Sequence, residues 1–97
     1  MLTIDQIKSA VAKVGKRYGI KNAYLFGSYA RGDANQYSDV DVLIDAGKIK
    51  GMIELSGFRL DLVDELGGTD VDVITTQGIM PKFFEMIKNE RVPLYGC

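Results

Sequence analysis

Residues 39–45, DVDVLID, constrain the fold more than any other stretch of this chain. Successive side chains of a β-strand point to opposite faces, so one face of such a strand would carry Val40, Val42 and Ile44. The other face would carry Asp39, Asp41, Leu43 and Asp45. A strand with one apolar face belongs to a sheet whose apolar side is covered by a second layer, usually of helices.

Three helices are predicted around this strand. Thr3 and Gln6 have the spacing of a capping box, and apolar residues then recur every three or four positions until Gly19. They are Ile4, Ile7, Val11, Val14 and Tyr18. A second stripe consists of Met52, Leu55, Phe58, Leu62 and Leu66, with Gly67 and Gly68 placed to end the helix in a left-handed cap.

The third helix is expected to begin at Pro81, which suits a first helical turn. It would carry Phe83, Phe84, Met86 and Ile87, and Pro93 is expected to end the regular structure. Met80 and these four apolar residues occupy more of the circumference than one core face needs. They therefore either pack in the core or form part of a docking surface.

Two further strands are predicted at residues 23–26 and 70–74. The order of elements gives an α/β fold, a small mixed β-sheet of three or four strands with helices packed on it. At 97 residues, with no visible linker or repeat, residues 1–97 are expected to form a single domain.

The composition excludes several classes of function. A net charge of −1 disfavours direct binding to nucleic acids. The chain has no histidine and one cysteine, Cys97, which excludes His-based triads, zinc sites and an internal disulfide. Charges interrupt the apolar positions of the first sixteen residues, which are typical neither of a signal peptide nor of a membrane span, so we expect a cytoplasmic protein.

Gly27 and Ser28 follow the strand predicted at 23–26. A glycine at a strand end lets the backbone approach a ligand closely, and Ser28 is expected to cap a short helix at 29–31. The free N–H groups of such a turn favour an anion. This pair is therefore the candidate binding site for phosphate groups.

Asp39 and Asp41 are the candidate metal ligands. On one strand face they stand roughly 7 Å apart, at about 3.3–3.4 Å per residue. Repulsion between them raises the pKa of at least one carboxyl unless a cation is present. Oxygen ligands of this kind suit Mg²⁺ that also binds substrate phosphates.

These residues resemble the signature of the DNA polymerase β-like nucleotidyltransferase superfamily: G-S, roughly ten residues, then D-x-D, with a third carboxylate on a later strand. Within it the chain is similar to the minimal nucleotidyltransferases, the MntA-type antitoxins of HEPN/MNT toxin–antitoxin systems. The similar segments are GSYARGDA, SDVDVLID, VDVI and VPLYG.

The resemblance implies an enzyme that moves AMP from ATP to a hydroxyl group, releasing pyrophosphate. Asp39, Asp41 and Asp72 would bind two Mg²⁺ ions, and Asp72 would also accept the proton of the acceptor. Asp70 lies on the same predicted strand face and is the alternative third carboxylate, although Asp72, flanked by valines, is favoured.

Three other polar residues are less clearly assigned. Arg31 either stabilises the triphosphate or forms a surface ion pair with Asp33. Asp45 is expected to be a solvated strand end. Ser38 either binds nucleotide or simply begins the strand.

The resemblance also implies the acceptor, a tyrosine of a partner HEPN toxin ribonuclease that AMP attachment silences. Two alternatives remain open: an antitoxin that neutralises its partner by occlusion without catalysis, and nucleotidyl transfer to RNA or a small molecule. The small size of the chain argues against the second, because such enzymes carry a further domain for the acceptor.

Overall fold

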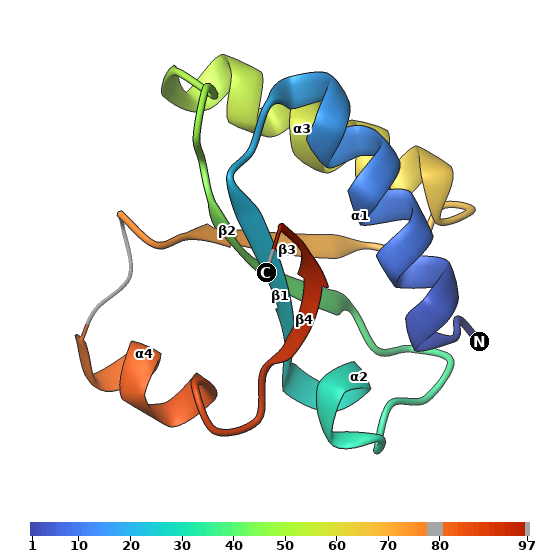
Figure 1. Ribbon diagram of the computed structural model, residues 1–97. Helices are drawn as coiled ribbons and strands as arrows, with labels where there is room; N and C mark the ends of the chain where they lie inside the picture. Colours follow the sequence, from blue (N-terminus) through green and yellow to red (C-terminus); the bar gives the residue numbers. More distant parts are fainter. Residues whose placement is uncertain (78–80, 97) are drawn as a thin grey trace.

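The computed structural model of the protein describes residues 1–77 and 81–96 (Figure 1). Its helices are α1 (Ile4–Tyr18), α2 (Gly27–Arg31), α3 (Gly51–Glu65) and α4 (Pro81–Ile87). Its strands are β1 (Asn22–Phe26), β2 (Val40–Asp45), β3 (Val71–Thr75) and β4 (Val92–Tyr95). The predicted α/β fold is confirmed, and β2 and β3 each begin one residue later than predicted.

The four strands form one mixed sheet in the order β3-β2-β1-β4. β1 pairs antiparallel with β2 and with β4, whereas β2 pairs parallel with β3. A parallel pair needs a crossover connection, and α3 supplies it between β2 and β3. The parallel pairing matters for the site, because it brings corresponding ends of β2 and β3 together.

One face of the sheet packs against α1 and α3, which lie side by side (Figure 1). Val40, Val42 and Ile44 of β2 are fully buried there, together with Val11 of α1 and Phe58 of α3. The alternation read from residues 39–45 therefore gives the correct buried face. Burial of these aliphatic and aromatic side chains stabilises the layers by roughly 1.5–3 kcal/mol each.

The ends of α1 and α3 follow from their sequence. Thr3 and Gln6 form both hydrogen bonds of the predicted capping box, and α1 ends at Gly19 in a left-handed conformation with φ of 73°. α3 is followed by Gly67 and Gly68, whose φ angles are also positive. Ile4 and Met52, predicted on the core stripes, are exposed instead, and each lies in the first turn of its helix.

The opposite face of the sheet is covered in part by α4 (Figure 1). Phe26, Leu43 and Ile87 form a second, smaller core there, and Phe83 and Phe84 pack against it. Met86 is 71% exposed, and Met80 lies outside the described residues. α4 has seven residues and does not cover this face completely: near the start of β3, Asp72 is exposed, whereas Asp41 of β2 is half-buried.

The strand β4 contradicts the expectation that Pro93 ends the regular structure. Pro93 lies within β4, at a register irregularity opposite Ala23 and Tyr24 of β1. β4 is an edge strand, and a proline is tolerated at an edge or a bulge because its missing N–H does not break a ladder. Leu94 of the same strand is 2% exposed and belongs to the main core.

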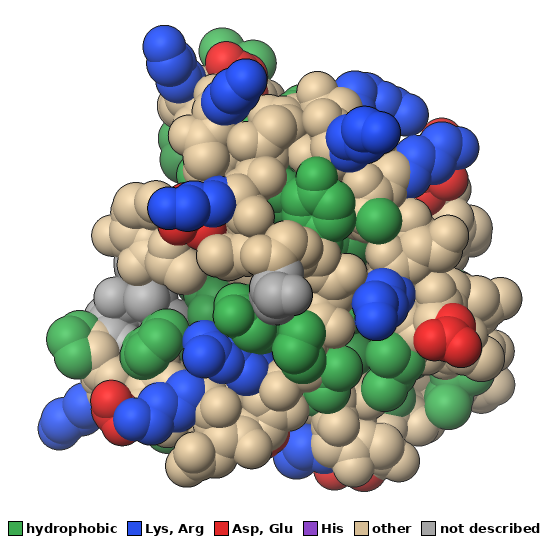
Figure 2. All heavy atoms as spheres, in the orientation of Figure 1, with side chains coloured by type: hydrophobic (Ala, Val, Ile, Leu, Met, Phe, Trp, Pro, Cys, Tyr) green, Lys and Arg blue, Asp and Glu red, His purple; other side chains and the backbone are tan. Residues whose placement is uncertain are grey.

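The surface carries charges of both signs. On the face seen in Figure 2, basic side chains are spread out rather than gathered into one patch, and some apolar side chains lie exposed toward the lower left, over α4. Among the described residues, no helix combines the length and the apolar character needed to cross a membrane.

Candidate active site

Asp41 and Asp72 lie next to each other on neighbouring strands. The parallel register of β2 and β3 pairs Asp41 with Asp72, between the valine pairs Val40–Val71 and Val42–Val73. Since their neighbours on β2, Val40 and Val42, point to the main core, the two carboxylates point to the face that carries α4. Two acidic side chains from separate strands thus meet on that face.

The environment of Asp41 disfavours its charged form. Burial raises the pKa of Asp41 to about 6, and the charges of Asp72 and Asp39 and a hydrogen bond with Asp72 add to the effect. The charge of Arg31 acts in the opposite direction. A carboxyl group whose charge is disfavoured by burial and by neighbouring carboxylates marks a candidate functional site, and a bound cation would favour its charged form.

Asp39 stands apart from this pair. It lies immediately before β2, is exposed, and acts on Asp41 through its charge. Within residues 1–77 and 81–96, no set of three or more Asp, Glu or Cys side chains has the geometry of a metal site. The structure therefore brings Asp41 and Asp72 together directly, and Asp39 only to their edge.

Gly27 forms the turn between β1 and α2 beside these carboxylates. Its φ is +75°, in the region that favours glycine, and a Cβ atom at this position would overlap the Oδ2 atom of Asp41. Both the conformation and the space thus require glycine. Ser28 was expected to cap the short helix, but α2 already begins at Gly27, its N-cap is Phe26, and no side chain caps it. Ser28 lies within the first turn instead.

Arg31 of α2 forms ion pairs at the surface. Its Nε atom lies 3.2 Å from Asp33 Oδ2, the predicted ion pair, and its Nη1 atom lies 3.4 Å from Glu90 Oε1. It also lines a pocket with Gly27, Ser28 and Asp41, and the apolar lining of this pocket comes from Phe26 and from α4. An arginine in this place can contact an anion that enters the pocket.

Glu90 is a polar residue of the site that the sequence analysis missed. It follows α4, lines the same pocket, and accepts a hydrogen bond of 3.2 Å from the backbone N–H of Gly27. Sixty-three positions separate the two residues. No spacing rule connects residues so far apart, and only the docking of the segment between α4 and β4 brings them together.

The remaining acidic and hydroxyl candidates have local partners. Asp70 lies outside β3, is exposed, and stands 3.7 Å from Arg59. Asp45 accepts hydrogen bonds from the N–H of Gly47 and from Gln77, at the far end of β2. Ser38 accepts a hydrogen bond from the N–H of Asn35 and so organises the loop before the strand. Of the two candidates for the third carboxylate, Asp72 is the one beside Asp41.

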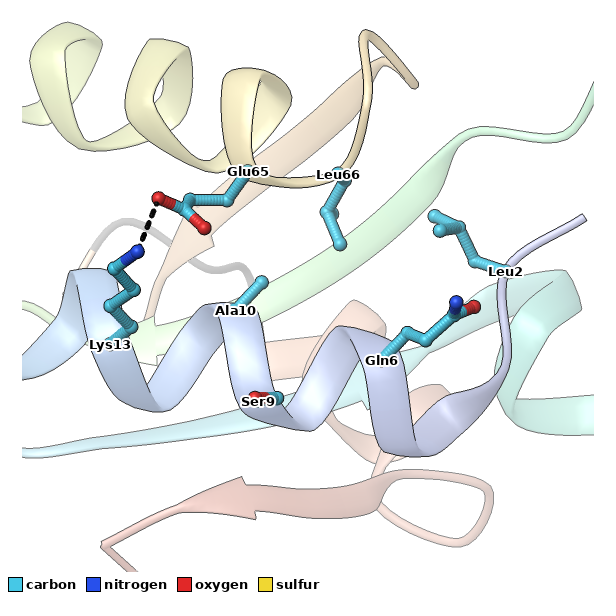
Figure 3. Close-up of a pocket in the computed structure, with 7 residues that line it drawn as sticks. All are labelled: Leu2, Gln6, Ser9, Ala10, Lys13, Glu65 and Leu66. Atoms are coloured by element: carbon cyan, nitrogen blue, oxygen red, sulfur yellow. Dashed lines mark ion pairs between the residues drawn. The ribbon is translucent and has the colours of Figure 1, made fainter.

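A second hollow lies between α1 and the end of α3 (Figure 3). Leu2, Gln6, Ser9 and Ala10 line one side, and Lys13 and Glu65 close one end with an ion pair of 3.0 Å (Figure 3). This hollow lies on the face of the sheet that α1 and α3 cover, away from the acidic residues.

Known proteins are similar to this chain in both sequence and fold. The family model described as "Nucleotidyltransferase domain" matches residues 4–94. A candidate protein adenylyltransferase of Methanocaldococcus jannaschii is 35% identical over 91 residues, which span 94% of this chain and 97% of that protein. The solved structure of a candidate minimal nucleotidyltransferase superposes with a TM-score of 0.81 at 28% identity, covering 96% of this chain and 97% of the other.

A third match comes from a toxin–antitoxin complex. The structure of a tri-AMPylated HEPN toxin of Shewanella oneidensis in complex with an MNT antitoxin contains a chain that superposes with a TM-score of 0.75. The identity is 18%, and the match covers 98% of this chain and 74% of the other. At this identity the likeness concerns the fold.

Proposed function

The chain belongs to the nucleotidyltransferase domain family and is a nucleotidyltransferase, and we propose that it transfers AMP from ATP to a hydroxyl group of a partner protein. The proposal depends above all on one observation, the juxtaposition of Asp41 and Asp72 beside the Gly27 turn. The relative from Methanocaldococcus jannaschii supports the choice of AMP, since its name describes a protein adenylyltransferase.

The side chains at this site fit Mg²⁺. Asp41 and Asp72 offer hard carboxylate oxygens from two rigid strands, and Asp39 adds a third carboxylate near their edge. The repulsion that contributes to the raised pKa of Asp41 would be relieved by a divalent cation. Asp39, Asp41 and Asp72 would hold the metal, which when bound lowers the pKa of an acceptor hydroxyl and neutralises charge on the phosphate oxygens.

The chain's own residues would divide the work of the reaction. Gly27, having no side chain, lets the triphosphate approach the turn, and Ser28 offers a hydroxyl and a backbone N–H beside it. Arg31 would stabilise the negative charge that grows on the leaving pyrophosphate. Asp72, the more exposed of the strand carboxylates, would accept the proton of the attacking hydroxyl.

The acceptor we propose is a tyrosine hydroxyl of a helical HEPN toxin, for which this chain would act as antitoxin. The complex of an AMPylated HEPN toxin with an MNT antitoxin supports this, because it contains a chain with the same fold as this one. The structure is also consistent with an acceptor brought by another protein, since α4 leaves Asp72 exposed.

Label transfer tests this function. The purified protein is incubated with Mg²⁺, a HEPN-type protein encoded beside it, and ATP labelled at either the α- or the γ-phosphate. We expect the partner to gain α-label and no γ-label, because pyrophosphate leaves. Absence of α-label, or transfer of γ-label, would contradict the proposal, and mass analysis of digested partner identifies the modified residue.

A double variant separates catalysis from occlusion. Asp39→Asn with Asp41→Asn removes two carboxylates from the site while keeping the size of both side chains. If the chain acts by adenylyl transfer, cells that produce the toxin lose their protection when this variant replaces the parent. Protection equal to that by the parent would show instead that binding alone neutralises the partner.

A further inference from the structure

Glu90 connects the segment after α4 to the two parts of the site that would meet phosphate. Its Oε1 atom accepts a hydrogen bond from the Gly27 N–H at 3.2 Å and lies 3.4 Å from Nη1 of Arg31. One carboxylate oxygen therefore contacts both the glycine turn and the guanidinium. Hydrogen bonds to a charged acceptor are stronger than those between neutral groups.

The position of Glu90 is itself fixed on both sides. Ile87, three residues earlier, is 3% exposed, and its carbonyl accepts hydrogen bonds from the backbone N–H groups of Glu90 and Arg91. The guanidinium of Arg91 stacks over the ring of Tyr24, with its Cζ atom 4.2 Å from the ring centroid. The carboxylate thus comes from an anchored turn rather than from a free surface loop.

The contact with Arg31 fixes the orientation of a flexible side chain. Asp33 binds the Nε edge of the guanidinium and Glu90 binds Nη1. An arginine has five N–H donors, so these two bonds orient its plane and leave further donors for a ligand. Arg31 also lowers the pKa of Asp41 through its charge, so the placement of this guanidinium affects the acidic pair too.

We propose that Glu90 is a positioning residue, which holds the Gly27 turn and Arg31 in the arrangement that receives the nucleotide phosphates. The inference rests on the proposed function, because it assigns the phosphates to this turn. The alternative is that Glu90 blocks the phosphate position and must leave before nucleotide binds. The two ideas predict opposite changes in nucleotide affinity.

The first test measures the turn itself and needs no activity. Amide hydrogen exchange at Gly27 is compared in the parent, Glu90→Ala and Glu90→Gln, with Glu85→Gln as the matched control. Glu85 pairs with Lys88 on the exposed side of α4 and does not contact Gly27. We expect exchange at the Gly27 amide to speed up by about tenfold in Glu90→Ala, because this variant loses one charge-assisted hydrogen bond. Glu90→Gln should largely restore the slow rate, because its amide oxygen still accepts.

The second test separates positioning from a merely structural role. We expect Glu90→Ala to raise KM for ATP by roughly tenfold, because contacts of the Gly27 turn with bound ATP are lost. It should also lower kcat by roughly tenfold, because Arg31 is no longer held where it stabilises the charge on the leaving pyrophosphate. Glu90→Gln should lie between Glu90→Ala and the parent, since it keeps the bond to Gly27 and loses the attraction to Arg31. The free energy of unfolding of Glu90→Ala should not fall in proportion to its rise in KM. The Glu85→Gln control should keep the KM of the parent.

Three results of these tests would count against the proposals for Glu90 or for the function of the chain. Unchanged exchange at Gly27 in Glu90→Ala, or an unchanged KM for ATP, would overturn the proposal. A lower KM would overturn it in favour of blocking by Glu90. If the parent transfers no label to any partner, the proposed function fails, and the exchange measurement still decides by itself whether Glu90 holds the turn.

Discussion

At the scale of single residues, the site is held at a cost to stability. Asp41 is half-buried beside two other carboxylates, and its raised pKa shows that the folded state disfavours its charge. Such a residue is retained for what it binds rather than for what it contributes to folding. Asp72 and Asp70 offer a second comparison at this scale, because they lie two residues apart and have different surroundings.

Replacing Asp41 with asparagine should stabilise the metal-free protein at neutral pH and above. With the folded pKa raised to about 6 from an unfolded value of 3.8, the folded state binds the proton more tightly. The contribution of Asp41 to the stability of the parent is therefore fully present below about pH 4 and is lost as the pH rises through about 6. After allowance for solvent screening of this half-exposed group, we expect Asp41→Asn to gain about 1–2 kcal/mol at pH 8.

Denaturant unfolding at pH 4 and pH 8, with and without Mg²⁺, measures this effect. The advantage of Asp41→Asn should shrink toward zero at pH 4, and Mg²⁺ should stabilise the parent more than the variant. An equal difference at both pH values would show that charge at residue 41 is not its cause.

Asp72→Asn and Asp70→Asn form a matched pair that identifies the third carboxylate. Asp72 stands in register with Asp41, whereas Asp70 is exposed and close to Arg59. We expect Asp72→Asn to slow label transfer by about 100-fold or more, the effect of removing a general base. Asp70→Asn should stay within about threefold of the parent. The reverse order of rates would assign the role to Asp70.

At the scale of secondary-structure elements, the sequence predicts the buried face of the central strand but does not predict how the strands pair. Alternation in residues 39–45 predicts the buried face correctly, because a half-buried strand must place Val40, Val42 and Ile44 together. Nothing in the local sequence sets the parallel register that pairs Asp41 with Asp72. The role of Gly27 was predictable as a turn, but its overlap with Asp41 depends on the neighbouring strand.

Gly27→Ala and Gly32→Ala compare two ends of α2. Both glycines have positive φ, 75° and 83°, so an added Cβ strains both by roughly 1–2 kcal/mol. Only at Gly27 would the Cβ also overlap Asp41, since nothing lies within 4 Å of a Cβ at Gly32. We expect Gly32→Ala to keep transfer within about threefold and Gly27→Ala to reduce it by about 100-fold, through the misplaced carboxylate.

Label transfer and unfolding measured on the same two variants check this comparison. Their stabilities should differ by less than their activities, because the strain is shared and the overlap is local. Equal losses of activity would mean that backbone strain alone accounts for both, and that Gly27 has no special relation to Asp41.

At the scale of the whole molecule, one face of the sheet forms the main core and the other face carries the acidic site. α1 and α3 cover one face and form the main core together with the strands, while α4 covers only part of the other face, where Asp72 stays exposed. Long-range docking decides the features that the sequence did not reveal. β4 forms at a free edge despite Pro93, and Glu90 reaches Gly27 only when α4 is in place.

The binding of a divalent metal with nucleotide tests the central claim most directly. Crystals of the protein grown with Mn²⁺, as a substitute for Mg²⁺, and a non-hydrolysable ATP analogue would be measured at the manganese absorption edge. We predict anomalous peaks within coordination distance of Asp41 and Asp72, with the triphosphate at the Gly27 turn. Peaks elsewhere, or an analogue bound away from these two strands, would contradict this account.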